Sequence, residues 1–264
     1  MLKGRGKKPA TAVFIAGLVL VVIGSFTQPA NGLDLLARFQ PPSTLHWFGT
    51  DWLGRDLFNR SLYGIASSLQ LGFLSALLGS MIALIMALGC QFSLVMDYLT
   101  NVLVNALCSV PHLLLLIMLS FALGGGRRGV IVAVALTHWP RLFRLLRSEI
   151  MQVRRTNWVR LSRKMGKSRW WVSRYHLFPH LAPQFLVGIV LIIPHAIIQA
   201  SAMTFLGFGL SPEQPDIGTM MAEAMPYLVG DFWWGILFPG MVLLGAVLMI
   251  DYSARRLKDG SSKI

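Results

Sequence analysis

The segment RLFRLLRSEIMQVRRTNWVRLSRKMGKSRWWVSR (residues 141–174) carries eleven Lys and Arg residues and one acidic residue, Glu149. Residues 175–212, which follow it, contain no charged residue. From there to residue 250 the chain has four acids and neither Lys nor Arg. Polytopic membrane proteins sort charge in this way, because their cytoplasmic loops accumulate Lys and Arg. The segment therefore predicts an all-α membrane protein with a long basic cytoplasmic loop.

The composition agrees with a membrane protein. The 264 residues are 55% hydrophobic and 13% charged, with a mean hydropathy of +0.61, whereas soluble domains are about 25% charged. The net charge of +13 would indicate nucleic-acid binding in a soluble protein. Basic cytoplasmic loops explain that charge without nucleic acid. We expect one membrane domain and no separate soluble enzyme domain.

Six stretches are apolar enough and long enough to cross a hydrocarbon core, which takes about 20 residues of helix. The expected spans are residues 10–26, 67–89, a stretch within 98–126 that contains Pro111, 129–146, 184–208 and 232–250. A basic start followed by an apolar run is also typical of a cleaved signal peptide. The first run is long for that purpose, and Gln28-Pro29-Ala30 is a poor cleavage site, which favours a retained helix.

Six spans place both termini on one side of the membrane. That side, which also has the turn at Asp97 and residues 141–183, then holds 19 of the 24 Lys and Arg residues. The opposite side holds seven of the eleven acids, so the count predicts an N-in, C-in orientation. We divide the chain into residues 1–66 (basic tail, first helix and extracytoplasmic connection) and residues 67–264 (a membrane core of five helices with a cytoplasmic loop at 150–183).

The loop at residues 150–183 is too long for a simple turn. Trp158, Leu161 (or Ser162) and Met165 follow helical spacing and form one apolar stripe. Gly166 ends this helix, and a second helix leads through Pro179 into the fifth span. Two interpretations remain open from composition: an interfacial helix on anionic headgroups, or a docking surface for a cytoplasmic partner.

Motifs for other functions are missing. Met165-Gly166-Lys167-Ser168 ends like a phosphate-binding loop, but position 161 is Leu where that pattern requires Gly. The chain has neither HExxH nor GxSxG, so an intramembrane enzyme has no support. A stand-alone secondary transporter is a further alternative. No acidic or Lys residue lies in the middle of an expected span, which argues against proton coupling.

The 150–183 loop resembles the cytoplasmic loop of bacterial ABC importer permeases, which has Glu-Ala-Ala, three residues, Gly, and a Leu-Pro whose Pro falls thirteen residues after that Gly. Gly166 and Phe178-Pro179 match this pattern in register. Arg160-Leu161-Ser162 replaces Glu-Ala-Ala. The role of the family's acidic residue is therefore not expected at position 160, whereas docking through the loop still is. The resemblance implies that the loop couples the chain to an ATPase. The residues it assigns to that coupling are Trp158, Arg160, Leu161, Ser162, Met165, Gly166 and Pro179.

Three further segments resemble the C-type subunit of the dipeptide/oligopeptide/nickel permease family. HWFGTDWLGRD (residues 46–56) is similar to its Gly-Thr-Asp-x-x-Gly-Arg-Asp signature, FLGFGL (205–210) to the end of its fifth span, and Phe238-Pro239-Gly240 to its last span. Together the matches extend over roughly residues 45–260. The signature residues are Gly49, Thr50, Asp51, Gly54, Arg55 and Asp56.

This resemblance implies the type I ABC importer permease fold, with cytoplasmic coupling helices, in the bacterial inner membrane. It implies a second homologous permease as heterodimer partner and two ATPase subunits, which hold ATP and Mg. It also implies an extracytoplasmic substrate-binding protein, contact with membrane lipid, and no cofactor in this chain.

The family carries nickel, metal chelates (metallophore complexes) and peptides. Leu136-Thr137-His138-Trp139 resembles nickel-type members, which favours nickel or a metal chelate and leaves di- or oligopeptides as the alternative. Histidine is a common metal ligand, and a histidine inside a span indicates function by default. A histidine hydrogen-bonded between helices is the simpler interpretation for His112, His138 and His195. The expected translocation path comprises His138, His195, Gln199 and Met203.

Overall fold

The computed structural model describes residues 34–208 and 216–261. All the elements in these residues are helical, apart from one isolated bridge between Thr50 and Asp56. The expected first span, residues 10–26, lies outside the described residues, so the six-span count and the orientation remain predictions.

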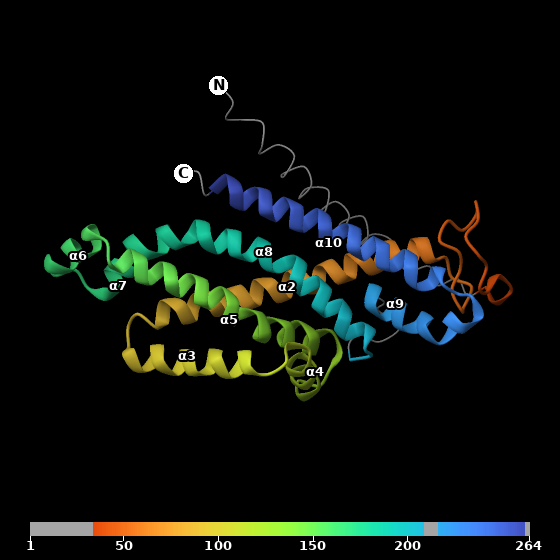
Figure 1. Cartoon of the computed structure of the whole chain (residues 1–264), viewed down its shortest axis with the longest axis horizontal. Helices are drawn as coiled ribbons and strands as arrows, with labels where there is room; N and C mark the ends of the chain where they lie inside the picture. Colours follow the sequence, from red (N-terminus) through yellow and green to blue (C-terminus); the bar gives the residue numbers. More distant parts are fainter. Residues whose placement is uncertain (1–33, 209–215, 262–264) are drawn as a thin grey trace, which may run out of the picture.

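Long apolar helices form the body of the molecule (Figure 1). They are α2 (Leu57–Gly89), α5 (Gly126–Arg154), α8 (Phe178–Phe205) and α10 (Trp234–Ser261). In the part of the chain that the structure describes, four helices are long and apolar enough to cross a membrane, or five if a bent pair counts as one. The 33 residues of α2 extend about 50 Å at 1.5 Å per residue, well beyond a hydrocarbon core of about 30 Å.

Glycines on α2 allow α5 and α8 to pack closely against it. A Cβ at Gly72 would lie 2.9 Å from the Cα of Ile197 on α8, and one at Gly79 would lie 2.9 Å from the carbonyl oxygen of Ala135 on α5. Small residues permit such close approach between membrane helices. In Figure 1, α2 crosses both neighbours near the middle of the molecule.

The third expected span is not one straight helix. It consists of α3 (Leu94–Ser109) and α4 (His112–Ala122), whose axes differ by 105°. Val110 between them is extended, as the residue before a proline prefers, so Pro111 breaks the span. Asp97 does not lie in a turn but in the first turn of α3, after the cap at Ser93.

All four long helices extend beyond the expected spans, α8 at its start and α10 at its end. Helix α2 begins well before residue 67 and runs unbroken through residues 66 and 67, because the Asp56 side chain caps its start by accepting from Asn59 N at 2.9 Å. The same carboxylate contacts Nδ1 of His46 at 2.8 Å. Helix α5 continues past residue 146 to Arg154, and its basic face turns toward α3, where Arg144 donates to Asn105.

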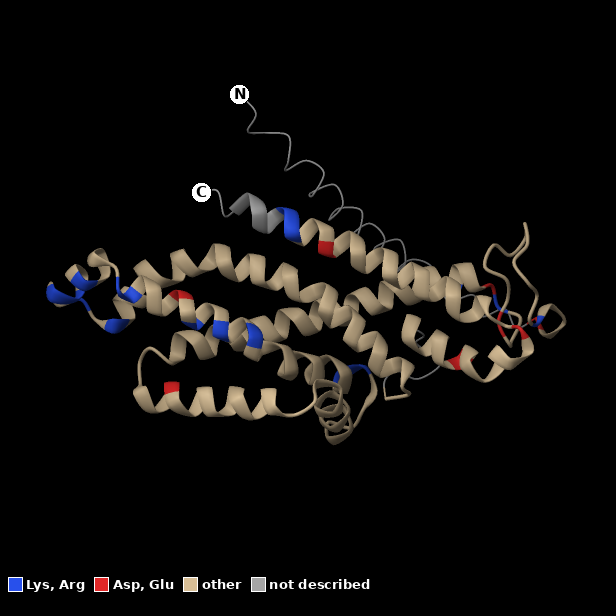
Figure 2. Ribbon diagram, viewed as in Figure 1, with Lys and Arg blue, Asp and Glu red and all other residues tan. Residues whose placement is uncertain are grey.

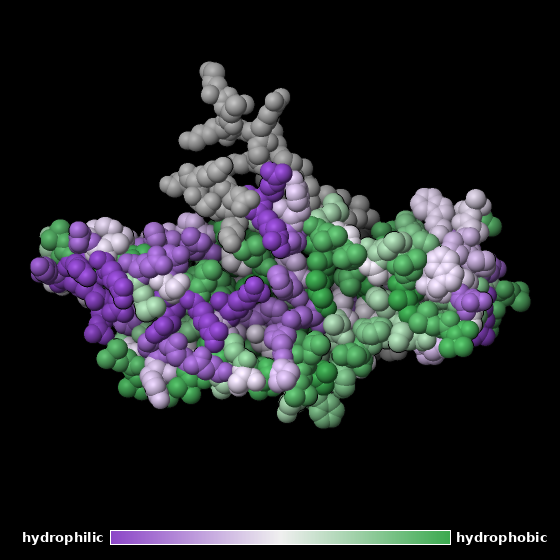
Figure 3. All heavy atoms as spheres, in the orientation of Figure 1, coloured by the Kyte–Doolittle hydropathy of each residue, from purple (hydrophilic) through white to green (hydrophobic). Residues whose placement is uncertain are grey.

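The two ends of the bundle differ in charge. The basic end comprises α6 (Asn157–Lys164), α7 (Arg169–Val172) and a π-helical turn (Ser173–Leu177). The loop end comprises residues 34–56 with η1 (Leu35–Ala37), α9 (Ile217–Ala224) and η3 (Met225–Gly230). Figure 2 shows Lys and Arg gathered at the basic end, and Figure 3 shows hydrophilic side chains over it and apolar ones over much of the rest of that face.

Candidate functional site

Helix α6 ends in a turn that Gly166 makes possible. Gly166 has φ +80°, a left-handed conformation that glycine adopts without the strain of a side chain. Its N–H donates to Arg163 O at 3.0 Å, and Lys167 N donates to Ser162 O at 3.2 Å. This is the hydrogen-bond pattern of a Schellman cap, so the predicted helix end at Gly166 is confirmed.

The apolar stripe of α6 points away from the bundle. Trp158, Leu161 and Met165 are 43%, 59% and 70% exposed, whereas Val159 on the other side is fully buried. Arg160 is also exposed. A group of large exposed apolar side chains rimmed by charge is typical of an interaction site. Trp158, Leu161 and Met165 therefore form an exposed apolar stripe on α6.

His176 connects α6 to the helix that becomes α8. Its Nε2 lies 3.0 Å from Ser162 Oγ, and its ring centroid lies 5.0 Å from that of Trp158 and 5.1 Å from that of Trp171. No sequence pattern singled out His176, because the π-helical turn that orients it has no signature of its own. Pro179 follows that turn, exposed in the first turn of α8.

The helix entering α8 is also held by the turn between α2 and α3. Gln91 Nε2 donates to Ser173 Oγ at 2.6 Å, and both residues are buried. Arg169 Nη1 donates to the carbonyl oxygen of Phe92 at 2.8 Å. The basic end is thus tied to the turn between α2 and α3 at two points.

The signature residues form a buried ion cluster at the loop end. Asp51 Oδ2 accepts from Arg55 Nε at 2.7 Å and from Arg60 Nη1 at 2.9 Å. Glu223 on α9 lies 2.7 Å from Arg60 Nη2 and 3.4 Å from Arg55 Nη2. Since Asp51 and Arg60 are 3% and 4% exposed, each charge depends on its partner. The cluster fixes the loop to α2 and α9, a role that includes Glu223, which the signature did not identify.

Two signature glycines are required by close backbone contacts. Gly49 and Gly54 have φ +74° and +78°. A Cβ would lie 2.5 Å from Gln40 O at the first and 1.8 Å from Asp34 O at the second. Thr50, fully buried, accepts from Gln40 N through its hydroxyl at 2.8 Å. The signature therefore specifies the shape of this loop.

Helices α8 and α9 meet at another buried polar contact. Thr204 Oγ1 lies 2.6 Å from Asp216 Oδ2, and Asp216 caps α9 by accepting from Thr219 N at 2.9 Å. Burial raises the pKa of the Asp216 carboxyl. The hydroxyl of Thr204 thus joins the end of α8 to the cap of α9.

Two residues of the expected translocation path lie near each other inside the bundle. His138 on α5 is 8% exposed, and its ring centroid lies 5.3 Å from that of His112. His112 Nε2 lies 2.5 Å from Gln199 Oε1 on α8. The contact of His112 matches the interhelical hydrogen bonding that is the simpler interpretation of a histidine within a span, whereas Nδ1 of His138 lies 2.8 Å from Val134 O on its own helix.

The other two residues of that path have different surroundings. His195 is exposed, with Nδ1 3.2 Å from the carbonyl oxygen of Leu191, and Met203 is fully buried. Within residues 34–208 and 216–261, no three His, Cys, Asp or Glu side chains gather into a possible metal site.

Known proteins resemble the chain over most of its length. The family described as "Binding-protein-dependent transport system inner membrane component" matches residues 79–260. The "Probable D,D-dipeptide transport system permease protein DdpC" of Escherichia coli (strain K12) is 34% identical over 250 residues, 92% of this chain and 83% of the relative. The "Dipeptide transport system permease protein DppC" of Bacillus subtilis (strain 168) is 31% identical over 246 residues, 92% of this chain and 75% of the relative.

A solved structure has the same fold. A chain of the inward-facing MetNI methionine ABC transporter superposes with a TM-score of 0.57 at 20% identity, over 77% of this chain and 97% of that one. The predicted relationship to ABC importer permeases is confirmed, whereas the leaning toward nickel finds no support in the relatives' names. The chain belongs to the family of binding-protein-dependent transport system inner membrane components, and it is a permease component of an ABC importer rather than an enzyme.

Proposed function

We propose that this chain is one of two homologous permease subunits of a heterodimeric importer for di- or oligopeptides. In this proposal two ATPase subunits bind ATP and Mg on the cytoplasmic side, and a substrate-binding protein delivers peptides from outside. Six spans orient the chain N-in and C-in, with the basic end in the cytoplasm. The distribution of Lys and Arg supports that orientation.

The exposed stripe on α6 carries the proposed coupling role. Trp158, Leu161 and Met165 present apolar side chains next to basic ones. A helix that only rests on lipid headgroups needs no fixed position relative to the bundle. Helix α6 does have one, because Gly166 caps it and Ser162 holds it to His176. A firmly positioned apolar surface suits docking with a protein partner.

The connections of α6 suit the transfer of motion. Only Arg155 and Thr156 separate α6 from α5, and the helix from Arg169 runs without a break to Phe205 in α8. A displacement of α6 would therefore move α5 and α8 as rigid bodies, as in other hinge and shear transitions.

The names of the relatives support a peptide as substrate. The E. coli and B. subtilis proteins are named for D,D-dipeptide and dipeptide transport. Peptide import accounts for these observations better than nickel or metallophore import.

Uptake by cells tests the proposal. A strain lacking this gene is compared with the same strain carrying the gene, using a radiolabelled dipeptide and radiolabelled nickel with and without a metallophore. We expect loss of dipeptide uptake on deletion, its recovery on complementation, and unchanged nickel uptake. Nickel uptake that depends on this gene while dipeptide uptake does not would refute the peptide assignment.

A further inference from the structure

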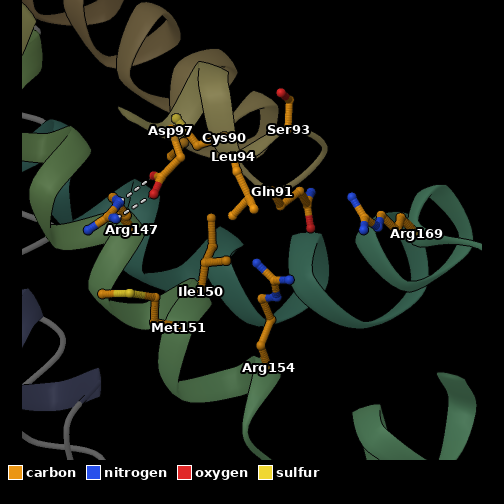
Figure 4. A pocket seen from close by; sticks show the side chains of 11 residues that line it. Cys90, Gln91, Ser93, Leu94, Asp97, Arg147, Ile150, Met151, Arg154 and Arg169 are labelled. Carbon is orange, nitrogen blue, oxygen red and sulfur yellow. Dashed lines mark hydrogen bonds and ion pairs between the residues drawn. The ribbon is translucent and has the colours of Figure 1, made fainter. Parts of the chain in front are cut away.

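A pocket of about 200 Å³ lies at the basic end, between the α2–α3 turn, the last turns of α5 and the start of α7. Figure 4 shows Arg154 and Arg169 directed into this space from different elements, with Gln91 and Leu94 also at its wall. None of these lining residues takes part in the exposed stripe of α6.

The pocket has unbalanced positive charge. Asp97 is the only acid among the described residues that line it, and Asp97 is already bound to Arg147 at two points of 2.7 Å. Arg169 donates one N–H to Phe92 O. Arg154, half-buried, has neither a hydrogen bond nor an ion pair with any described residue. Two guanidinium groups are thus available to an anion with several oxygens, and arginine suits phosphate in particular.

The surface beside the pocket is apolar. Leu94, Val95 and Tyr98, at the start of α3, are 89%, 66% and 69% exposed. A groove of about 410 Å³ along α3 shares Ser93 with the pocket. Its other walls are Met86, Val95, Met96, Leu99, Thr100 and Leu103. Basic pockets between membrane helices next to apolar surface recognise lipid headgroups.

We propose that this pocket binds the phosphate group of an anionic phospholipid from the leaflet at the basic end. Arg154 and Arg169 are the ligands of the phosphate, and the acyl chains lie along the exposed side of α3. The apolar flank distinguishes this lipid from free phosphate, which would use the arginines alone. The inference rests on the chain's place in the membrane and is independent of the substrate that it transports.

Lipid titration of the assembled importer tests this site. The complex containing this chain is delipidated in detergent, and binding of short-chain phosphatidylglycerol, phosphatidylcholine and inorganic phosphate is measured by native mass spectrometry. The test variant is Arg154→Gln with Arg169→Gln. The control is Arg155→Gln with Arg174→Gln, which removes the same charge at two exposed arginines outside the pocket. A third variant, Leu94→Glu, adds a carboxylate at the pocket edge while removing only an exposed side chain.

We expect the wild-type complex to bind phosphatidylglycerol more tightly than phosphatidylcholine. Removal of each pocket arginine should weaken the binding of phosphatidylglycerol about fivefold. Leu94→Glu weakens it similarly, and the control pair leaves it within about twofold of wild type. Equal losses in the test and control pairs, or wild-type binding in both pocket variants, would overturn the site. Displacement of phosphatidylglycerol by inorganic phosphate at equal concentration would overturn the assignment to lipid.

Discussion

Arg147 on α5 binds Asp97 on α3 at two points: Nε donates to Oδ1 and Nη2 donates to Oδ2, both at 2.7 Å. Helix α3 buries only Thr100 and Val104, so few apolar contacts hold it against the bundle. A two-point guanidinium–carboxylate pair fixes orientation as well as distance. This pair therefore sets the position of the first arm of the broken span.

A double-mutant cycle measures the contribution of this pair. We predict that Asp97→Ala and Arg147→Ala each destabilise the chain and that their coupling free energy is about 1 kcal/mol, since both side chains are partly exposed. The measurement is denaturant unfolding in detergent of the wild type, both single variants and the double variant. Strictly additive effects of the two substitutions would show that the pair does not hold α3.

Substitution in the ion cluster at the loop end should lower the free energy of unfolding more than loss of the Asp97–Arg147 pair does. Asp51→Asn leaves Arg55 and Arg60 facing a neutral amide at a buried position, which should cost about 3 kcal/mol of unfolding free energy. Asp231→Asn is the matched control, because Asp231 is exposed and asparagine tolerates its positive φ of 64°. Thermal unfolding in detergent compares the two. An unfolding midpoint for Asp51→Asn equal to that of the control would show that the ion cluster does not hold the loop to α2 and α9.

The contact between α8 and α9 leaves no space for a side chain at Gly218. A Cβ there would lie 2.0 Å from Thr204 Oγ1 and 2.2 Å from Ser201 O. We predict that Gly218→Ala destabilises the chain by about 1–3 kcal/mol. At Gly245, also helical, a Cβ has open space, and Gly245→Ala should be neutral or stabilising. Similar unfolding midpoints for the two variants would disprove the close contact.

The cap of α6 predicts a graded series at Gly166. Gly166→Val forces a β-branched residue to φ +80° and should cost about 1–2 kcal/mol locally, whereas Gly166→Asn should retain most of the cap. No atom lies within 4 Å of the added Cβ, so any effect comes from the backbone. Co-purification of the ATPase subunits should fall for Val and persist for Asn. The reverse order would show that the cap does not position α6.

The features that depend on a local sequence pattern could be predicted from the sequence. Charge sorting indicated the basic end, helical spacing located α6, and Gly166 marked its end. It did not predict the extension of α2 to Leu57, because the cap at Asp56 lies within a polar segment that looked like a connection. The 105° break at Pro111 was also missed, since proline is tolerated within many membrane helices.

Contacts between residues far apart in the chain could not be predicted, for a different reason. Glu223 completes a cluster with Arg60, 163 positions away along the chain, and His176 reaches Ser162 only because a π-helical turn orients it. Nothing in the local composition of α9 or the turn indicates these partners. The four expected path residues were chosen by residue type and by their position within or near expected spans, and neither property indicated that His195 is exposed while Met203 is fully buried.

Cross-linking from α6 tests the central claim that this helix docks an ATPase subunit. In a Cys108→Ser background, which removes the exposed native thiol, Leu161→Cys is compared with Val229→Cys, which is 99% exposed at the loop end. With a short bifunctional cross-linker on the assembled importer, we predict a product between the ATPase and residue 161 and none with residue 229. Absence of the product at residue 161, in a complex that still contains the ATPase and transports peptide, would contradict the account.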